Sequence, residues 1–285
     1  MLQIVIYLSI AILLGGTIYK TVKISRMPIH LRWDLYPIPH EKGKAHYGGS
    51  YYEESNWWTK PVHTSLSAEI MEISKEILGI KSLYRNNRKL WYFSYPFHIG
   101  LYLLTALLAF LFLSAISNLS GVVISANAPN IFGRAIYYTT IIVGVPGWIL
   151  GLLGAAGLLI MRLSKSDYRR YSTKSDYFSL ILLIALLASG LYAWFSVDRS
   201  FAILRDFTHS LLMAKSIGVL PAAVQLELIL VAFFFTYLPF THMTHFVGKF
   251  FTYHRVRWQD KPNIAGGKIE SEVAHALDGK VGWQA

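Results

Sequence analysis

Three histidines lie inside long apolar runs of this sequence, and they are its strongest candidates for chemistry. His98 falls in YPFHIGLYLL, and His242 and His245 fall in YLPFTHMTHFVGK. An imidazole ring offers a nitrogen lone pair to a metal, whereas lipid supplies no partner for that nitrogen. Neutral imidazoles held on rigid helices can serve as axial ligands of a haem iron. The first question is therefore whether helices bring these rings to a common level.

The runs that carry the histidines are long enough to cross a membrane. Apolar stretches occur near residues 4–19, 91–116, 135–161, 177–197 and 221–248, and a hydrocarbon core of about 30 Å needs roughly 20 helical residues. The composition agrees, because 54% of the 285 residues are hydrophobic and only 15% are charged. We expect an all-α integral membrane protein, a bundle of five transmembrane helices.

The basic residues are unevenly distributed among the connections. Eleven Lys and Arg fall in 23–89, five in 162–174 and six in 249–285, whereas 118–134 and 198–220 hold four between them. The positive-inside rule assigns the first three segments to the cytoplasm. This places the protein in the cytoplasmic membrane with its N-terminus outside and its C-terminus inside. The topology accounts for the net charge of +11, so no nucleic-acid partner is indicated.

The chain is expected to have four parts: a transmembrane helix at 1–22, a large cytoplasmic loop at 23–90, a four-helix haem-binding membrane bundle at 91–250 and a cytoplasmic tail at 251–285. Apolar residues at helical spacing near the end of the loop predict an amphipathic helix that lies against the membrane or a partner. The chain has no cysteine, which excludes an iron–sulfur cluster, a disulfide or a covalently attached haem within it.

His98 and the histidine pair are expected at similar depth on the cytoplasmic side. His98 follows Lys89 by nine residues, about 13 Å along a helix, and His245 precedes Lys249 by four. Depth does not decide between His242 and His245, which are about 60° apart around a helix. For each histidine, a hydrogen bond to a neighbouring helix is the alternative to haem ligation. Basic residues that could pair with haem propionates are Arg88, Lys89, Lys249 and Arg255.

The motifs around these histidines carry a family resemblance. YPFHIGLYLL at 95–104 and YLPFTHMTHFVGKFFTYH at 237–254, together with the RWDLYP…YGGSYYEE…WW loop, resemble the gamma (cytochrome b) subunit of respiratory nitrate reductase. The likeness is closer to its relatives in sulfate-reducer transmembrane redox complexes, the DsrM/TmcC type, and in membrane heterodisulfide reductases.

This resemblance implies a cytochrome b membrane subunit that exchanges electrons between menaquinone and a cytoplasmic iron–sulfur subunit of the heterodisulfide-reductase type. Other membrane or periplasmic cytochrome subunits are further candidate partners. The resemblance assigns His98 and His245 as the axial ligands of the inner haem b iron, and it leaves His242 beside the haem pocket.

The sequence departs from the family at the two positions that ligate an outer haem. Leu108 and Glu227 stand there, and they do not form a pair of imidazole ligands. We therefore expect one haem b per chain. A second haem would require His209 with an unconventional ligand such as Met213, or a ligand from another subunit.

Glu227 is a carboxylate inside an apolar run, which is an expensive placement and hence a candidate functional site. On a continuous helix it shares a face with His245, about 27 Å away. It could exchange protons with a quinone, with His209 and Arg134 bonding the quinone carbonyls. A quinone site nearer the haem is the alternative location. A structural ion pair is the alternative role for Glu227, with candidate partners Arg134, Arg199 and Arg205.

Two other functions compete with electron transfer. A haem-free subunit could simply anchor a soluble redox complex to the membrane. A transporter could use Glu227 and His209 as a proton relay, although the absence of an inverted repeat disfavours it.

Small residues spaced along the third apolar run predict close helix packing in preference to space for a macrocycle; they are Gly144, Gly147, Gly151 and Gly154.

Overall fold

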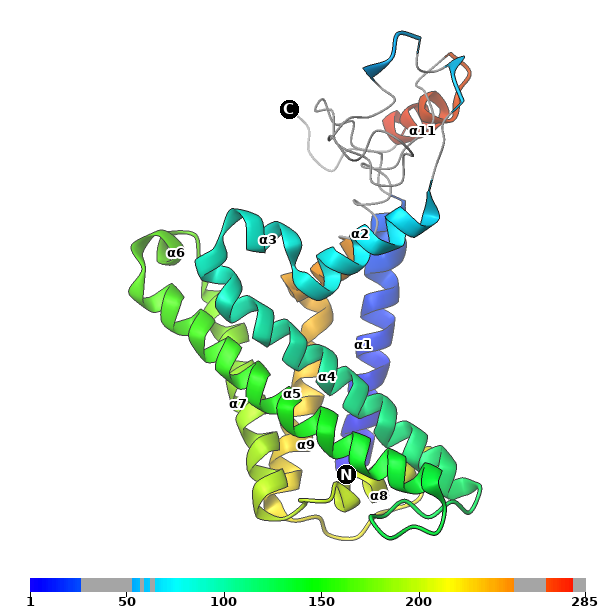
Figure 1. Cartoon of the computed structure of the whole chain (residues 1–285), viewed down its shortest axis with the longest axis vertical. Helices are drawn as coiled ribbons and strands as arrows, with labels where there is room; N and C mark the ends of the chain where they lie inside the picture. The colour runs from blue at the N-terminus through cyan, green and yellow to red at the C-terminus, as the bar shows by residue number, and fades with distance from the viewer. Residues whose placement is uncertain (27–52, 57–58, 62–64, 249–264, 279–285) are drawn as a thin grey trace. The chain divides into compact units, whose positions relative to one another are not determined.

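The computed structural model describes residues 1–26, 53–56, 59–61, 65–248 and 265–278. The regular structure in this part of the chain is helical, with no β-strand (Figure 1). The expected RWDLYP loop motif and the residues Lys249, His254 and Arg255 lie outside the described residues. The helices are α1 (Leu2–Ser25), α2 (Leu66–Gly79), α3 (Lys81–Asn86), α4 (Arg88–Leu119), α5 (Ile131–Ser164), α6 (Ser166–Arg170), α7 (Lys174–Ser196), α8 (Ala202–Leu212), α9 (Ala222–Tyr237), η4 (Leu238–Phe240), η5 (His242–Thr244) and α11 (Lys268–Leu277).

Among the described residues, five helical segments are long and apolar enough to cross a membrane: Leu2–Ser25, Arg88–Leu119, Ile131–Ser164, Lys174–Ser196 and Ala222–Phe240. The fold class expected from the sequence is therefore confirmed. The last span differs from the expectation, because the apolar run continues to 248 while the spanning helix ends at Phe240.

Contacts divide the chain into two compact units, and each is described by itself. The first unit joins Met1–Ala11 to Leu78–Thr236, and the second joins Ile12–Ile77 to Tyr237–Ala285. Helix α1 is shared between them, since its N-terminal part belongs to the first unit and its C-terminal part to the second.

Side-chain caps define where the spanning helices of the first unit begin. The Asn87 side chain accepts a hydrogen bond from the Leu90 backbone N–H at 3.1 Å at the start of α4, and Asn130 caps α5 in the same way. Helix α7 starts with a capping box in which Thr173 and Asp176 bond each other's backbone N–H groups. Each cap satisfies N–H groups that the helix itself leaves unpaired.

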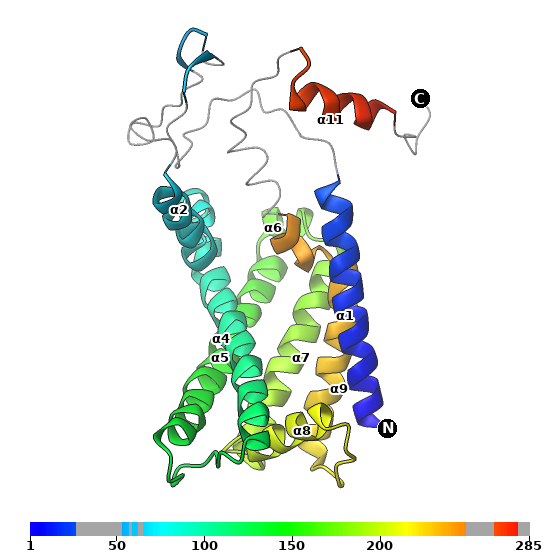
Figure 2. The same ribbon diagram turned by 90° about the vertical axis from the view of Figure 1, so that its right-hand side faces the viewer.

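Helices α4 and α5 approach each other backbone to backbone. A Cβ placed on Gly100 would lie 2.3 Å from the backbone nitrogen of Gly151, and a Cβ placed on Gly154 would lie 2.4 Å from that of Phe97. Both distances are far below van der Waals contact, so only glycine fits. The predicted role of the α5 glycines in helix packing is thus confirmed, and Figure 2 shows the two helices crossing.

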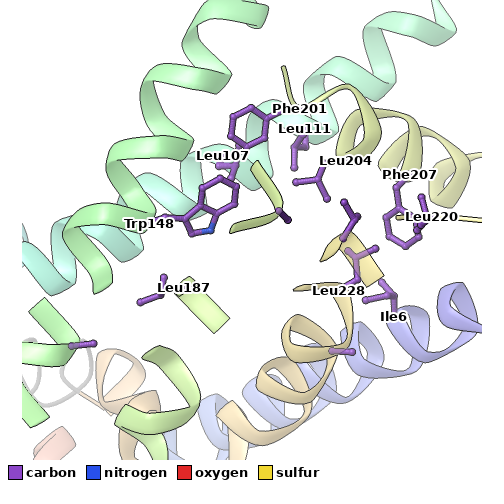
Figure 3. Packing of buried hydrophobic residues seen from close by; sticks show 14 of the residues in the cluster. Ile6, Leu107, Leu111, Trp148, Leu187, Phe201, Leu204, Phe207, Leu220 and Leu228 are labelled. Atoms are coloured by element: carbon purple, nitrogen blue, oxygen red, sulfur yellow. The ribbon is translucent and has the colours of Figure 1, made fainter. Parts of the chain in front are cut away.

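The core of the first unit gathers where α8 meets the membrane helices (Figure 3). Trp148 of α5 stacks on Phe201 with 5.4 Å between ring centroids, and the Phe201 side chain is fully buried. Phe201 immediately precedes α8, so this stacking pins the start of α8 to α5. Further buried members of the cluster are Leu107, Leu111, Leu187, Leu204, Val224 and Leu228.

The N-terminal part of α1 joins this unit through polar contacts. Gln3 Nε2 donates to the Ser210 hydroxyl at 2.9 Å and to the Lys215 carbonyl at 2.8 Å. The Tyr7 hydroxyl donates to the Leu211 carbonyl. These bonds hold the beginning of α1 beside the end of α8, where Figure 2 shows the two together.

The contact between α4 and α5 yields a first prediction. Gly154→Ala should lower the free energy of unfolding by about 1–3 kcal/mol, the usual cost of overpacking, because the new methyl group would meet the Phe97 backbone. Thermal unfolding in detergent measures this change. Gly15→Ala is the matched control, since nothing lies within 4 Å of a Cβ at Gly15. Equal stability of the two variants would refute the close contact.

Candidate functional site

His98 lies ten residues into α4, near the end of its third turn, and its ring is oriented by its own helix. Nδ1 lies 2.7 Å from the Ser94 carbonyl oxygen and 3.3 Å from the Ser94 hydroxyl. A carbonyl oxygen can only accept, so Nδ1 carries the proton and the lone pair is on Nε2. Metal-ligating histidines in proteins are held in this way, with the second nitrogen donating to a fixed acceptor.

The backbone on both sides of His98 is held by the α4–α5 contact. Phe97 packs against Gly154, and Gly100 packs against Gly151. The Phe97 ring also meets the His98 ring edge to face, with 5.3 Å between centroids. The position of His98 along and around α4 is therefore set by packing that does not involve its own imidazole.

The segment that carries His242 and His245 is not a continuation of α9. Pro239 lies in the short helix η4, Thr241 has an extended backbone (φ −109°, ψ 170°), and a second short helix, η5, follows. Residues 245–248 are helical again. The expected continuous helix over 221–248 is wrong at Thr241. The shared helix face and the axial spacing predicted for Glu227 and His245 therefore do not apply.

His245 repeats the hydrogen bond seen at His98. Its Nδ1 lies 3.2 Å from the His242 carbonyl oxygen, so its Nε2 carries the lone pair. Both His242 and His245 are exposed within the second unit. His242 thus supports its neighbour through its backbone. At both His98 and His245 a backbone carbonyl thus identifies Nδ1 as the protonated ring nitrogen, as is common for metal-ligating histidines.

Two of the four basic residues expected near haem propionates are described by the structure. Arg88 is exposed, donates to the Tyr84 hydroxyl and lies over the Tyr84 ring at 4.3 Å. Lys89 is exposed. Lys249 and Arg255 fall outside the described residues. The part of the chain that the structure describes holds no cluster of three or more His, Asp or Glu side chains suited to a metal ion.

Glu227 belongs to a group of buried charges in the first unit. Glu227 is 6% exposed, Arg205 5% and Asp198 4%. Glu227 Oε2 and Arg205 Nη1 are buried without a hydrogen-bond partner among the described residues. Asp198 lies within electrostatic reach of both Glu227 and Arg205, and the three side chains linked through Asp198 are called the buried charge cluster here.

Asp198 organises this cluster by capping α8. Its two carboxylate oxygens accept from the backbone N–H groups of Ile203 and Leu204 at 3.1 and 3.0 Å. Burial raises the pKa of Asp198, while those backbone donors and the charge of Arg205 act in the opposite sense. Burial likewise lowers the pKa of Arg205, and Asp198 counteracts the shift. The Arg205 guanidinium carbon also lies 5.4 Å from the Tyr137 ring centroid.

The other residues expected around Glu227 have different surroundings. Arg134 is exposed and donates to the Ala128 carbonyl at 3.1 Å, which ties it to the connection before α5. His209 is half-buried on α8, one turn after Arg205. Glu227 makes no ion pair within 4 Å to Arg134, Arg199 or Arg205, so the structural ion pair considered for it is not present.

Sequence reasoning missed the roles of three residues. Asp198 accepts hydrogen bonds from backbone N–H groups at the start of α8, and Ser94 contacts the ring of His98. A pattern of apolar residues reveals neither role. Lys20 was a detectable signal, because an ionisable residue inside an apolar run is costly unless it has a partner. Its Nζ donates to the Thr241 carbonyl and the Thr244 hydroxyl.

These helices define a multi-pass integral membrane protein, and comparison with known families identifies the family to which it belongs. The model of the nitrate reductase gamma subunit family matches residues 80–260. That match covers more than half of the chain, and the chain belongs to this family. Its members are membrane cytochrome b subunits that transfer electrons within multisubunit redox complexes. No curated protein and no solved structure matches the sequence.

Asp198 yields a second prediction, on pH dependence. A raised pKa in the folded protein means that folding favours the protonated carboxyl, so the stability it contributes declines as pH rises from the ordinary value of about 4. Asp198→Asn should remove that slope and lose a cap bond, worth about 1 kcal/mol. The deficit of the variant relative to wild type should therefore shrink from pH 4 to pH 7 in thermal unfolding.

The matched control for this measurement is Asp206→Asn, because Asp206 is an exposed carboxylate on α8, the helix that Asp198 caps. Parallel pH profiles for wild type and Asp198→Asn would contradict the burial of a titrating carboxyl at this position.

Proposed function

We propose that this chain is the menaquinone-reactive cytochrome b subunit of a respiratory redox complex. It transfers electrons between menaquinone and a cytoplasmic iron–sulfur subunit through a single haem b. Family membership supports the class of protein. The observation that carries the residue-level proposal is the matching hydrogen bond at His98 and His245, where a backbone carbonyl engages Nδ1 and leaves the lone pair on Nε2.

Each part of the proposed haem site has a defined task. Bound haem b would supply one-electron oxidation and reduction. His98 would ligate the iron from α4 and His245 from the segment after η5, while the His242 carbonyl keeps the His245 ring in place. Positive side chains would neutralise the propionates; the candidates from the sequence are Arg88, Lys89, Lys249 and Arg255.

The surroundings of Leu108 support one haem in preference to two. Leu108 is 40% exposed, whereas its neighbours Leu107 and Leu111 are buried in the core of the first unit. The α4 position that carries an outer ligand in the family therefore faces away from the core here. Glu227, at the second position, lies in the buried charge cluster. Neither position offers an imidazole to a second haem.

The buried charge cluster is the proposed site of quinone and proton chemistry. Oxidation of a quinol releases two protons with its two electrons. Among the described residues, Glu227 Oε2 and Arg205 Nη1 are an acceptor and a donor without hydrogen-bond partners, so Glu227 can take the two protons in turn while Arg205 bonds a quinone oxygen. His209, one turn along α8, and Arg134 are proposed at the edge of this site. The uneven basic charge places it on the outer side of the cytoplasmic membrane.

Haem content tests the first part of the proposal. The purified complex should contain one b-type haem per chain, seen in a reduced-minus-oxidised spectrum and quantified chemically. His98→Ala and His245→Ala should each abolish this haem, because an iron with one missing imidazole loses its axial pair. His242→Ala should retain it at least in part, since the carbonyl that bonds His245 belongs to the backbone.

Three results would contradict this assignment. Absence of haem from the wild-type complex would leave a haem-free anchor as the function. Two haems per chain would show that Leu108 and Glu227 do not mark the loss of the outer haem. Loss of haem in His242→Ala alone would make His242 the ligand in place of His245.

Glu227→Gln tests the quinone site. Without a carboxylate to receive the quinol proton, menaquinol oxidation by the complex should slow by about 10²-fold or more, while haem content stays unchanged. Asp206→Asn, which removes an exposed carboxylate from α8, should leave the rate at its wild-type value. Unimpaired turnover in Glu227→Gln would move the quinone site elsewhere, nearer the haem.

A further inference from the structure

Lys20 of α1 holds the break in the last spanning segment. Its Nζ donates to the Thr241 carbonyl at 2.9 Å and to the Thr244 hydroxyl at 2.8 Å. All three residues belong to the second unit. Thr241 is the extended residue at which the helical path is interrupted, and Thr244 directly precedes His245. One ammonium group therefore bonds both the residue at the break and the residue that precedes His245.

The contact extends along one face of α1. Gly16, Lys20 and Ile24 are four residues apart, which places them on the same side of a helix. A Cβ on Gly16 would lie 2.6 Å from the Pro239 Cβ, and a Cβ on Gly248 would lie 3.9 Å from the Ile24 side chain. The stripe thus follows the chain from before the break to after His245.

The break leaves a backbone carbonyl in need of a hydrogen-bond donor, and Lys20 supplies one. An extended residue within an otherwise helical path leaves its carbonyl without the usual helical partner, and apolar surroundings provide none. The Thr241 carbonyl accepts from Lys20 and from the Thr244 hydroxyl. A lysine that only extended toward the membrane surface would be exposed, as Lys23 is on the same helix. Lys20 instead bonds two acceptors near the break.

We propose that Lys20 is a positioning residue for His245. By fixing the break, it sets the orientation of the segment whose His242 carbonyl bonds the His245 ring, and it places a positive charge beside that segment. The inference rests on the proposed function in one respect, the assignment of His245 as a haem ligand. Residues 1–79 lie outside the family match, so this contribution comes from a part of the chain that the family model does not include.

A labelling experiment tests the mechanical part without reference to haem. The chain has no cysteine, so Met243→Cys introduces a single thiol into η5. In detergent, its reaction with a maleimide should become several-fold faster when Lys20→Met is added, because the break is released. Lys23→Met should leave the rate unchanged. Equal rates with Lys20 and Lys20→Met would overturn the proposal.

The haem provides the second readout, on the purified complex with Met243 intact. Lys20→Met should lower haem occupancy or shift the midpoint potential downward, because loss of a nearby positive charge disfavours the reduced haem. Lys20→Arg keeps the positive charge but not the compact ammonium geometry. It should therefore bring the midpoint potential close to the wild-type value, while the thiol of Met243→Cys still reacts faster than it does with Lys20. Lys23→Met should match wild type in both measurements.

The outcomes separate the two proposals. A wild-type complex without haem would contradict the proposed function, while faster labelling in Lys20→Met would still support the role of Lys20 at the break. A wild-type complex with haem, together with unchanged occupancy and potential in Lys20→Met, would overturn the role of Lys20 alone. If Lys20→Met does not accumulate, Thr244→Val removes one of the two acceptors and should give an intermediate rise in labelling rate.

Discussion

The backbone contact between α4 and α5 is the constraint on which the first unit depends. Helices in lipid gain little from burying apolar surface against each other, so close packing of small residues has to supply the attraction. At Gly100, Gly151 and Gly154 no side chain separates the helices, and their spacing is set by main-chain atoms. His98 stands within this contact, so its placement follows from two helices whose registry leaves almost no freedom.

The candidate chemistry divides into two environments of opposite character. The histidines are neutral groups held by backbone carbonyls, and their geometry is determined by local hydrogen bonds. The buried charge cluster instead contains ionisable groups from α8, α9 and the turn before α8, two of which have a polar atom without a hydrogen-bond partner in the described part of the chain. An imidazole site of the first kind suits a cofactor that must stay in place. A cluster of the second kind suits a ligand or proton that comes and goes.

Composition and charge were sufficient to predict the helical membrane fold, and residue spacing was sufficient to predict close packing at the α5 glycines. The role of His98 as a haem ligand stays a prediction. The break at Thr241 was not predictable from Pro239, which lies two residues before it. Pro96 and Pro146 lie inside α4 and α5 without interrupting them, whereas Pro239 precedes an interruption. The difference lies in a distant partner, since Lys20 satisfies the carbonyl that the break exposes. The buried charge cluster was hidden for the same reason, because Asp198 and Glu227 meet only through the fold.

The contacts of α1 have a consequence for how the molecule is made. Its bonds from Gln3 and Tyr7 reach 207 and 204 residues along the chain, and those from Lys20 reach 221 and 224. The polar groups of α1 therefore find these acceptors only after 204 or more further residues have been translated. Until Thr241 and Thr244 have been translated, the ammonium of Lys20 has no acceptor there. A chain truncated before residue 241 would therefore lack both of the acceptors that Lys20 has in the folded protein.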